Sequence, residues 1–165
     1  MAHTQQVQSP LTVNRDFAKS CPGVLRVLQI LFGAAFWITI ASSKYEGSSH
    51  FAVFVAVFFW LMTLALYFLT LLDKQDLVPI LGGNHWLLTN LIQDVVATAL
   101  YAAAIGIVIY KTEQYSFCNV EKYRLPCYYK VYLVASAFGC VCAVVYLISA
   151  IYFVCRKCRG GQIVI

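Results

Sequence analysis

The stretch WLLTNLIQDVVATALYAAAIGIVIYK, residues 86–111, decides the fold. It is apolar for longer than the roughly 20 helical residues that are needed to cross a hydrocarbon core of about 30 Å. Asp94 lies about a third of the way along it, where a charged side chain costs about 2.5–3.5 kcal/mol on insertion scales. The stretch therefore predicts a transmembrane helix whose carboxylate faces a partner or water.

The rest of the chain has the composition of a membrane protein. It is 61% hydrophobic and 12% charged, whereas soluble domains average about 45–50% apolar and about 25% charged. Four apolar runs are long enough to span a bilayer. Unpaired backbone groups are too costly in lipid, and the runs are too long for barrel strands, so each is expected to be a helix. The predicted fold is all-α, an integral membrane four-helix transmembrane bundle with spans at about 23–41, 51–72, 86–110 and 128–154.

The four spans leave little room for anything else. We expect an N-terminal cytosolic tail at 1–20, the transmembrane domain at 21–157 and a C-terminal cytosolic tail at 158–165. The formal net charge of +5 could suggest nucleic acid, but the basic residues flank the spans and are better explained as headgroup contacts. No nucleic-acid partner and no cofactor is expected.

The orientation follows from the flanking charges. Residues 1–20 are polar and lack the apolar core of a signal peptide, so the first span should act as its own insertion signal. Four spans place both ends on one side of the membrane. Seven Lys and Arg residues lie on that side and five on the other, which favours cytoplasmic ends. We expect a multi-pass protein of the plasma membrane, of vesicle membranes or of both.

The cysteines fit this orientation. Cys118 and Cys127 lie in the last outer loop, where an oxidising exterior would favour a disulfide, although two unpaired thiols remain the alternative. Cys155 and Cys158 follow the fourth span beside basic residues, which is typical of reversible palmitoylation at the cytoplasmic face.

Asp94 has a candidate partner in the first span. Spans one and three run in the same direction, and Asp94 lies about eight residues, or about 12 Å, into span three. The backbone of Arg26 lies closer to the start of its span than that of Asp94 does, but the long Arg26 side chain can reach several ångströms. Together with Gln29 and Gln93 the two charges could form a buried polar cluster between helices. The structural interpretation is an interhelical pin, and the functional alternative is a proton or ion pathway.

Other features point to partners. Small residues at helical spacing, such as the pairs Ala102/Gly106 and Ala135/Gly139, favour close packing within the bundle over a homo-oligomer seam. Short segments around residues 125–134 loosely match proposed cholesterol motifs. The C-terminal residues Ile163, Val164 and Ile165 could add a strand to a PDZ groove, with an unbound tail as the alternative.

The order of these elements resembles a known family. The first span carries the pattern G-x-L-x-x-x-Q-x-x-x-G-x-x-x-W at Gly23, Leu25, Gln29, Gly33 and Trp37, and the second span opens FAVFVAVFFW. The chain resembles the MARVEL domain, the four-helix membrane module of the MAL, plasmolipin, physin and occludin groups, over about residues 20–157. The resemblance implies cytoplasmic termini and non-catalytic roles: organising cholesterol-rich membrane, vesicle trafficking, membrane apposition and links to the cytoskeleton. The long coiled-coil tail of occludin is absent, so its scaffold binding is not implied.

Two other functions compete with a membrane-organising role. A channel or transporter would use Asp94, but inverted repeats and broken helices are missing from the sequence. A membrane thiol oxidoreductase would use the C-x-x-C spacing of Cys155 and Cys158, but no second C-x-x-C accompanies it. We therefore expect no enzymatic activity, and other membrane proteins and the bilayer itself as partners.

Overall fold

The computed structural model describes residues 13–43, 47–74, 77–78, 83–114 and 129–160. Within these ranges the regular structure is helical, which confirms the all-α fold class. The elements are α1 (Arg15–Lys19), α2 (Cys21–Ala41), α3 (Ser49–Leu71), the short 3₁₀ turn η2 (Gly83–His85), α4 (Trp86–Gln114) and α5 (Tyr129–Cys158).

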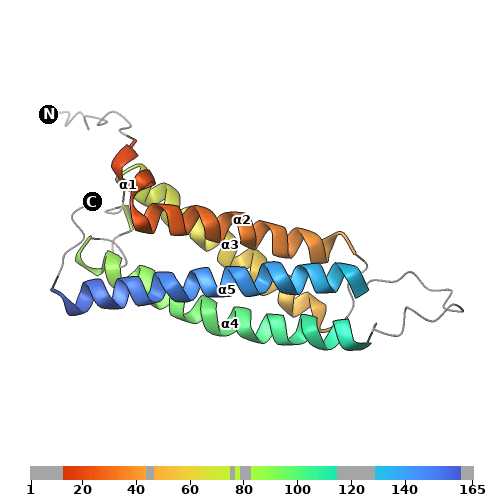
Figure 1. The fold of residues 1–165 in the computed structure, drawn as a ribbon. Coiled ribbons are helices and arrows are strands. Elements are labelled where there is room, and N and C mark those ends of the chain that lie inside the picture. The colour runs from red at the N-terminus through yellow and green to blue at the C-terminus, as the bar shows by residue number, and fades with distance from the viewer. Residues whose placement is uncertain (1–12, 44–46, 75–76, 79–82, 115–128, 161–165) are drawn as a thin grey trace, which may run out of the picture.

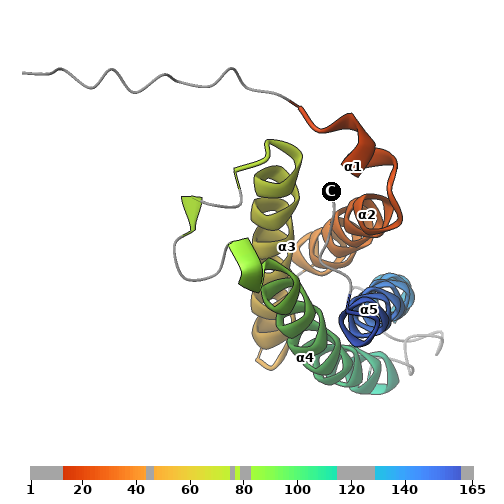
Figure 2. The ribbon, with the colours of Figure 1, turned by 90° about the vertical axis from the view of Figure 1, so that its left-hand side faces the viewer.

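Four of these helices, α2 to α5, are long and apolar enough to cross a membrane. They pack side by side as an up-and-down bundle, with α2 and α4 running in one direction and α3 and α5 in the other (Figure 1). The start of α2 and the end of α5 therefore lie at the same end of the bundle. Seen along its length, the bundle places α3 beside α4 on one side and α2 beside α5 on the other (Figure 2).

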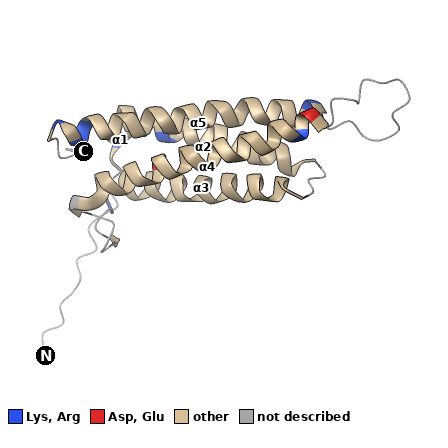
Figure 3. Ribbon diagram, turned by 90° about the horizontal axis from the view of Figure 1, so that it is seen from below, with Lys and Arg blue, Asp and Glu red and all other residues tan. Residues whose placement is uncertain are grey.

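Apart from the buried Arg26 and Asp94, charged residues gather at the two ends of the bundle, while the long sides carry other residue types (Figure 3). Large hydrophobic side chains such as Phe54, Leu31 and Ile151 are more than half exposed on these sides. In water such a surface would cause aggregation, but in a bilayer it is the surface that faces lipid. The pattern explains why the sequence lacks a polar stripe along any of the four helices.

The core is narrow and built around small residues. Phe36 of α2, Tyr101 of α4 and Tyr146 of α5 are fully buried and form a row of tilted rings, with successive ring centroids 5.7 and 5.4 Å apart. They fit because Gly33 and Gly139 leave space for them: a Cβ on Gly139 would come within 2.9 Å of the Phe36 ring. The centre of the bundle is thus filled with side chains.

The helix α1 was not expected from the sequence. It precedes α2 at the end of the bundle where α5 finishes, and its Phe17 is 5% exposed and packs against Tyr67 of α3. The Asn14 side chain accepts a hydrogen bond from the Phe17 N–H at 3.0 Å and caps the helix. The Asn14 N–H also donates to the carbonyl of Leu71 at 2.8 Å, which fastens α1 to the end of α3.

Candidate functional site

The polar cluster expected around Asp94 is present, and Arg26 of α2 lies at its centre. Arg26 is 2% exposed. One terminal nitrogen donates to Asp94 Oδ1 at 2.6 Å and to Gln29 Oε1 at 2.7 Å, and the other donates to Asn90 Oδ1 at 2.7 Å. Gln29 lies one turn further along α2, so the two side chains share a face of that helix. Arg26 therefore connects α2 to α4 through an ion pair and a hydrogen bond.

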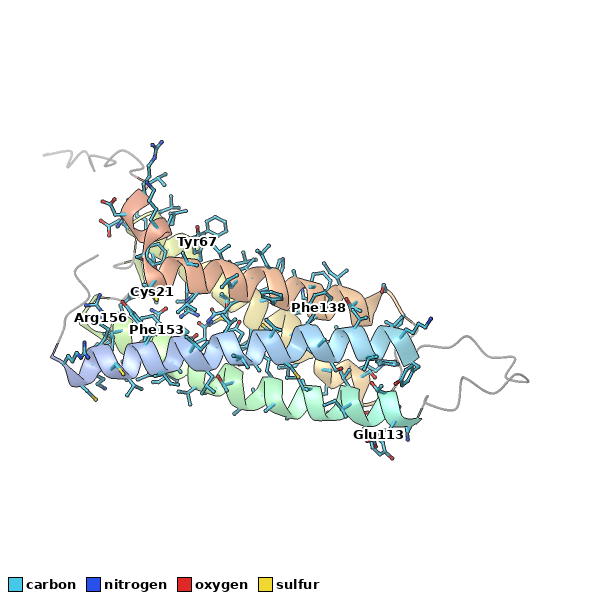
Figure 4. The ribbon with its side chains drawn as sticks, viewed as in Figure 1. Cys21, Tyr67, Glu113, Phe138, Phe153 and Arg156 are labelled. Carbon is cyan, nitrogen blue, oxygen red and sulfur yellow. The ribbon has the colours of Figure 1, made fainter. Side chains whose placement is uncertain are left out.

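Asp94 of α4 connects a third helix to this cluster. Its side chain is fully buried, and its second oxygen, Oδ2, accepts a hydrogen bond from the Ser149 hydroxyl of α5 at 2.5 Å. Both carboxylate oxygens thus have a charged or hydroxyl donor. Phe153, near the end of the bundle that carries α1 (Figure 4), places its ring 5.9 Å from the Arg26 guanidinium carbon, a cation–π arrangement.

The sequence missed two members of the cluster, Asn90 and Ser149. Asn90 lies one turn before Asp94 on α4 and could have been found from that spacing, because residues four apart share a helix face. Its amide is fixed by a hydrogen bond from Nδ2 to the carbonyl of Trp86 at 2.8 Å. Ser149 gave no comparable signal, since a single serine in an apolar span is common in membrane helices.

Gln93 does not join the cluster with Arg26. Its Nε2 donates to the Thr63 hydroxyl of α3 at 3.1 Å, and Thr63 lies 2.7 Å from the Tyr146 hydroxyl of α5. Gln93 precedes Asp94 by one residue, which rotates its side chain by about 100° around the helix. The structure therefore contains two separate series of side-chain hydrogen bonds. One runs from Arg26 through Asp94 to Ser149, and the other runs from Gln93 through Thr63 to Tyr146.

A small cavity adjoins the first of these series at the end of the bundle that carries α1. Its volume is about 20 Å³, and its lining includes the polar residues Arg26, Asn90 and Thr70. This is enough for one water molecule. Phe17 of α1 and Phe153 of α5 also line the cavity, so it is a small end chamber and not a continuous passage.

Some of the other candidate residues are exposed in the structure, and the rest lie outside the described residues. Cys155 and Cys158 are exposed in the last turns of α5, next to Arg156, and Cys21 is exposed where α2 begins at the same end (Figure 4). The candidate disulfide, Cys118 and Cys127, and the candidate PDZ ligand, residues 163–165, lie outside the described residues.

The charged atoms of the cluster are already bonded within the protein. No group of three or more His, Cys, Asp or Glu that could hold a metal occurs within the described ranges. Asp94 has donors on both oxygens, and Arg26 has no free terminal nitrogen in the cluster. What the cluster can do is hold three helices, α2, α4 and α5, in fixed register.

The fold and the cluster can now be compared with known proteins. The family model described as "Membrane-associating domain", MARVEL, matches residues 17–152. The chain belongs to the MARVEL family. The MARVEL family resemblance predicted from the first two spans is thereby confirmed.

Individual MARVEL relatives cover most of the chain. "MARVEL domain-containing protein 1" of Danio rerio is 64% identical over 150 residues, which are 91% of this chain and 93% of the relative. Plasmolipin of Bos taurus is 32% identical over 149 residues, 87% of this chain and 75% of the relative. "CKLF-like MARVEL transmembrane domain-containing protein 8" of Bos taurus is 31% identical over 98 residues, 58% of this chain and 55% of the relative. No solved structure matches the chain.

Proposed function

We propose that this MARVEL protein is a non-catalytic organiser of membrane microdomains that takes part in vesicle trafficking or membrane apposition. The observation that carries the proposal is the closed interior of the bundle. Asp94 is fully buried and both of its oxygens are bonded within the protein. A bundle whose buried charges are satisfied internally presents a mainly apolar surface to the bilayer, and it acts through what packs against that surface.

The interior also argues against a channel. Beyond the two series of hydrogen bonds, Phe36, Ile105 and Gly139 meet so closely that a methyl group on Gly139 would lie 3.0 Å or less from both neighbours. Such packing leaves no path for water at this level of the described bundle, and conduction requires a continuous path.

We further propose that both ends of the chain face the cytosol at the plasma membrane or at vesicles. Described cations are more numerous at the end that carries α1: Arg15, Lys19, Lys74, Arg156, Lys157 and Arg159. The opposite end carries Lys111 and Lys130. An excess of basic residues marks the cytoplasmic side of membrane proteins.

The exposed thiols at this end support lipidation. Cys155 and Cys158 have basic neighbours and sit where α5 leaves the bilayer, so an acyl chain on either sulfur would insert into the adjacent leaflet. We propose that this modification sets the compartment in which the protein resides. Cytoskeletal or PDZ-domain partners would be reached through the tails on the same side.

Proximity labelling from the C-terminus tests the proposal. A biotin ligase fused after residue 165 should label cytosol-facing proteins of the plasma membrane and vesicles. The Cys155→Ser/Cys158→Ser variant, expressed at the same level as the wild type, should label proteins of different compartments. The matched control is Cys140→Ser, since Cys140 lies on the lipid-facing side of α5 away from its end. Labelling of lumenal proteins by the wild type would refute the orientation.

Ion flux separates the organiser from the channel. Proteoliposomes with the wild-type chain should leak no faster than empty vesicles to protons, sodium or chloride. An Asp94-dependent flux, present in the wild type and lost in Asp94→Asn, would overturn the proposed function.

A further inference from the structure

A groove between α3 and α4 opens on the lipid-facing side of the bundle. Its volume is about 460 Å³, and its walls are apolar: Phe58, Met62, Ile92 and Val96 contribute most of the exposed carbon. His85 and Thr89 lie at the end where α4 begins. The groove thus runs from the edge of the bilayer into the hydrocarbon region.

Apart from His85 and Thr89 at its end, the polar residue that lines this groove is Gln93. It is 93% buried, being 7% exposed, and its Oε1 has no hydrogen-bond partner among the described residues. Gln93 lies seven residues after the start of α4, so it is about 10 Å below the beginning of that helix. A buried carbonyl without a donor costs free energy, and more so where no water can reach it.

The direction of the hydrogen bonds shows that the unsatisfied atom is an acceptor. The Tyr146 hydroxyl lies 3.5 Å from the carbonyl of Phe59, which can only accept. If Tyr146 donates there, Thr63 must donate to Tyr146 and must itself accept from Gln93. The amide nitrogen of Gln93 is therefore used within the protein, and its carbonyl remains for a donor from outside.

A lipid that fits this groove needs three parts in order. It needs a polar headgroup at His85 and Thr89, a hydrogen-bond donor a short distance below, and hydrocarbon along Phe58 and Val96. The glycerol esters of a phospholipid only accept hydrogen bonds. A sterol has a hydroxyl but no polar group above it. The backbone of a sphingolipid carries an amide N–H and a hydroxyl between headgroup and chains.

We propose that the α3–α4 groove binds a sphingolipid, with the amide or hydroxyl of its backbone donating to Gln93 Oε1. This inference depends on the chain lying in a bilayer and is independent of the proposed organising role. It names a ligand for one face of the bundle, and a failure of the binding test would leave the labelling and flux experiments unaffected.

Photocrosslinking of the purified full-length protein in phosphatidylcholine nanodiscs tests the proposal. Two probes share the phosphocholine headgroup and carry the same photoreactive acyl chain, one on sphingomyelin and the other on a diacyl phospholipid. We expect the sphingomyelin probe to label peptides of the groove about fivefold more, the ratio expected from one added hydrogen bond. Unlabelled sphingomyelin should compete for this labelling.

Two variants and a control complete the test. Gln93→Leu removes the acceptor and should reduce sphingomyelin labelling to the level of the diacyl probe. Val96→Phe fills the groove without touching the bonds from Gln93 to Thr63, and it should reduce labelling by both probes. Val144→Phe, at a half-exposed position on α5, is the control and should change neither.

Other outcomes would overturn the assignment. Equal labelling by the two probes would mean that the groove holds ordinary boundary lipid. Competition by cholesterol as strong as that by sphingomyelin would make the ligand a sterol. Labelling that persists in Val96→Phe, or that maps outside α3 and α4, would place the lipid elsewhere.

Discussion

Arg26 and Asp94 show how a membrane span can contain charge. Each would cost about 2.5–3.5 kcal/mol alone in the centre of the bilayer on insertion scales. Here the ion pair measures 2.6 Å, and Gln29, Asn90 and Ser149 supply further hydrogen bonds. The charges are retained because each one satisfies the other, and the pair then fixes the relative positions of three helices.

A double-mutant cycle measures this pairing. Arg26→Leu and Asp94→Leu should each lower the free energy of unfolding by about 3 kcal/mol, because each leaves an unpaired charge in a buried site. The double variant Arg26→Leu/Asp94→Leu should recover most of that loss, since no charge remains. Unfolding in mixed detergent micelles provides the measurement.

The surface position Val95 supplies the control for this cycle. It is half exposed on α4 next to Asp94, so Val95→Leu should leave stability unchanged. If the double variant were as unstable as the sum of the two single variants, the two residues would not be coupled. The interpretation of the cluster as a structural pin would then be wrong.

Residue types and spacing were sufficient to predict that Arg26 and Asp94 face one another, because depth in the bilayer follows from residue number. Residue types and spacing were insufficient to predict the hydrogen-bond partners of Gln93 and Ser149. Which side chain points at which neighbour depends on the rotation and tilt of each helix, and packing against adjacent helices sets both. A change of one residue along α4 is enough to direct Gln93 to α3 and Asp94 to α2 and α5.

The same limit applies to whole helix faces. Gly106 and Gly139 each belong to a small-residue pair at the spacing that lets helices approach closely. In the structure a Cβ at Gly139 would lie 2.9 Å from Phe36 and 3.0 Å from Ile105, whereas one at Gly106 would contact nothing within 4 Å. Only Gly139 lies in a helix interface, and the sequence pattern alone did not distinguish the two.

These two glycines form a matched pair for a packing test. Gly139→Ala should destabilise the bundle by about 1–3 kcal/mol, because the added methyl group forces α5 away from α2 and α4. Gly106→Ala should be neutral. Thermal unfolding in the same detergent compares them directly, and equal effects would argue against the close contact at Gly139.

The four long helices were predictable because hydropathy and length are properties of the sequence itself. The helix α1 was not, because five residues form no stable helix alone and α1 depends on tertiary contacts with α3. The turn between α1 and α2 needs Gly23, since a Cβ there would lie 2.0 Å from the carbonyl oxygen of Phe17. Gly23 is the first residue of the pattern on which the family resemblance was based, and this contact gives a physical reason for a glycine there.

Gly23→Ala should therefore release α1 from the bundle. Hydrogen–deuterium exchange of residues 14–20 should become fast, because the bonds from the Phe17 and Ser20 N–H groups would be lost. Exchange in the centre of α4 should stay slow. Protection of α1 that persists in this variant would show that the turn can relax around a methyl group.

At the scale of the molecule, the shortest spanning helix is about as long as the hydrocarbon core is thick, and the longer helices extend beyond it. The helix α2 has 21 residues and is about 31 Å long, close to the hydrocarbon thickness of about 30 Å. The helix α5 has 30 residues and is about 45 Å long, so its ends extend into the headgroup regions. Lys130, Arg156 and Lys157 lie on these ends, where cations meet lipid phosphates.

This geometry predicts opposite solvent access for the two ends of the bundle. Under the orientation and acylation proposed above, a chain that keeps only Cys155 in a cysteine-free background should react with a membrane-impermeant maleimide only after two treatments. The plasma membrane must be permeabilised, and thioesters must be cleaved with hydroxylamine. A chain whose single cysteine is introduced by Gln114→Cys should react in intact cells, because Gln114 is exposed at the other end of the bundle. The expectation follows from the excess of basic residues beside α1 and from the antiparallel course of α4 and α5. Reaction of Cys155 in intact cells would invert the orientation, and reaction of both positions from one side would contradict the four-span fold.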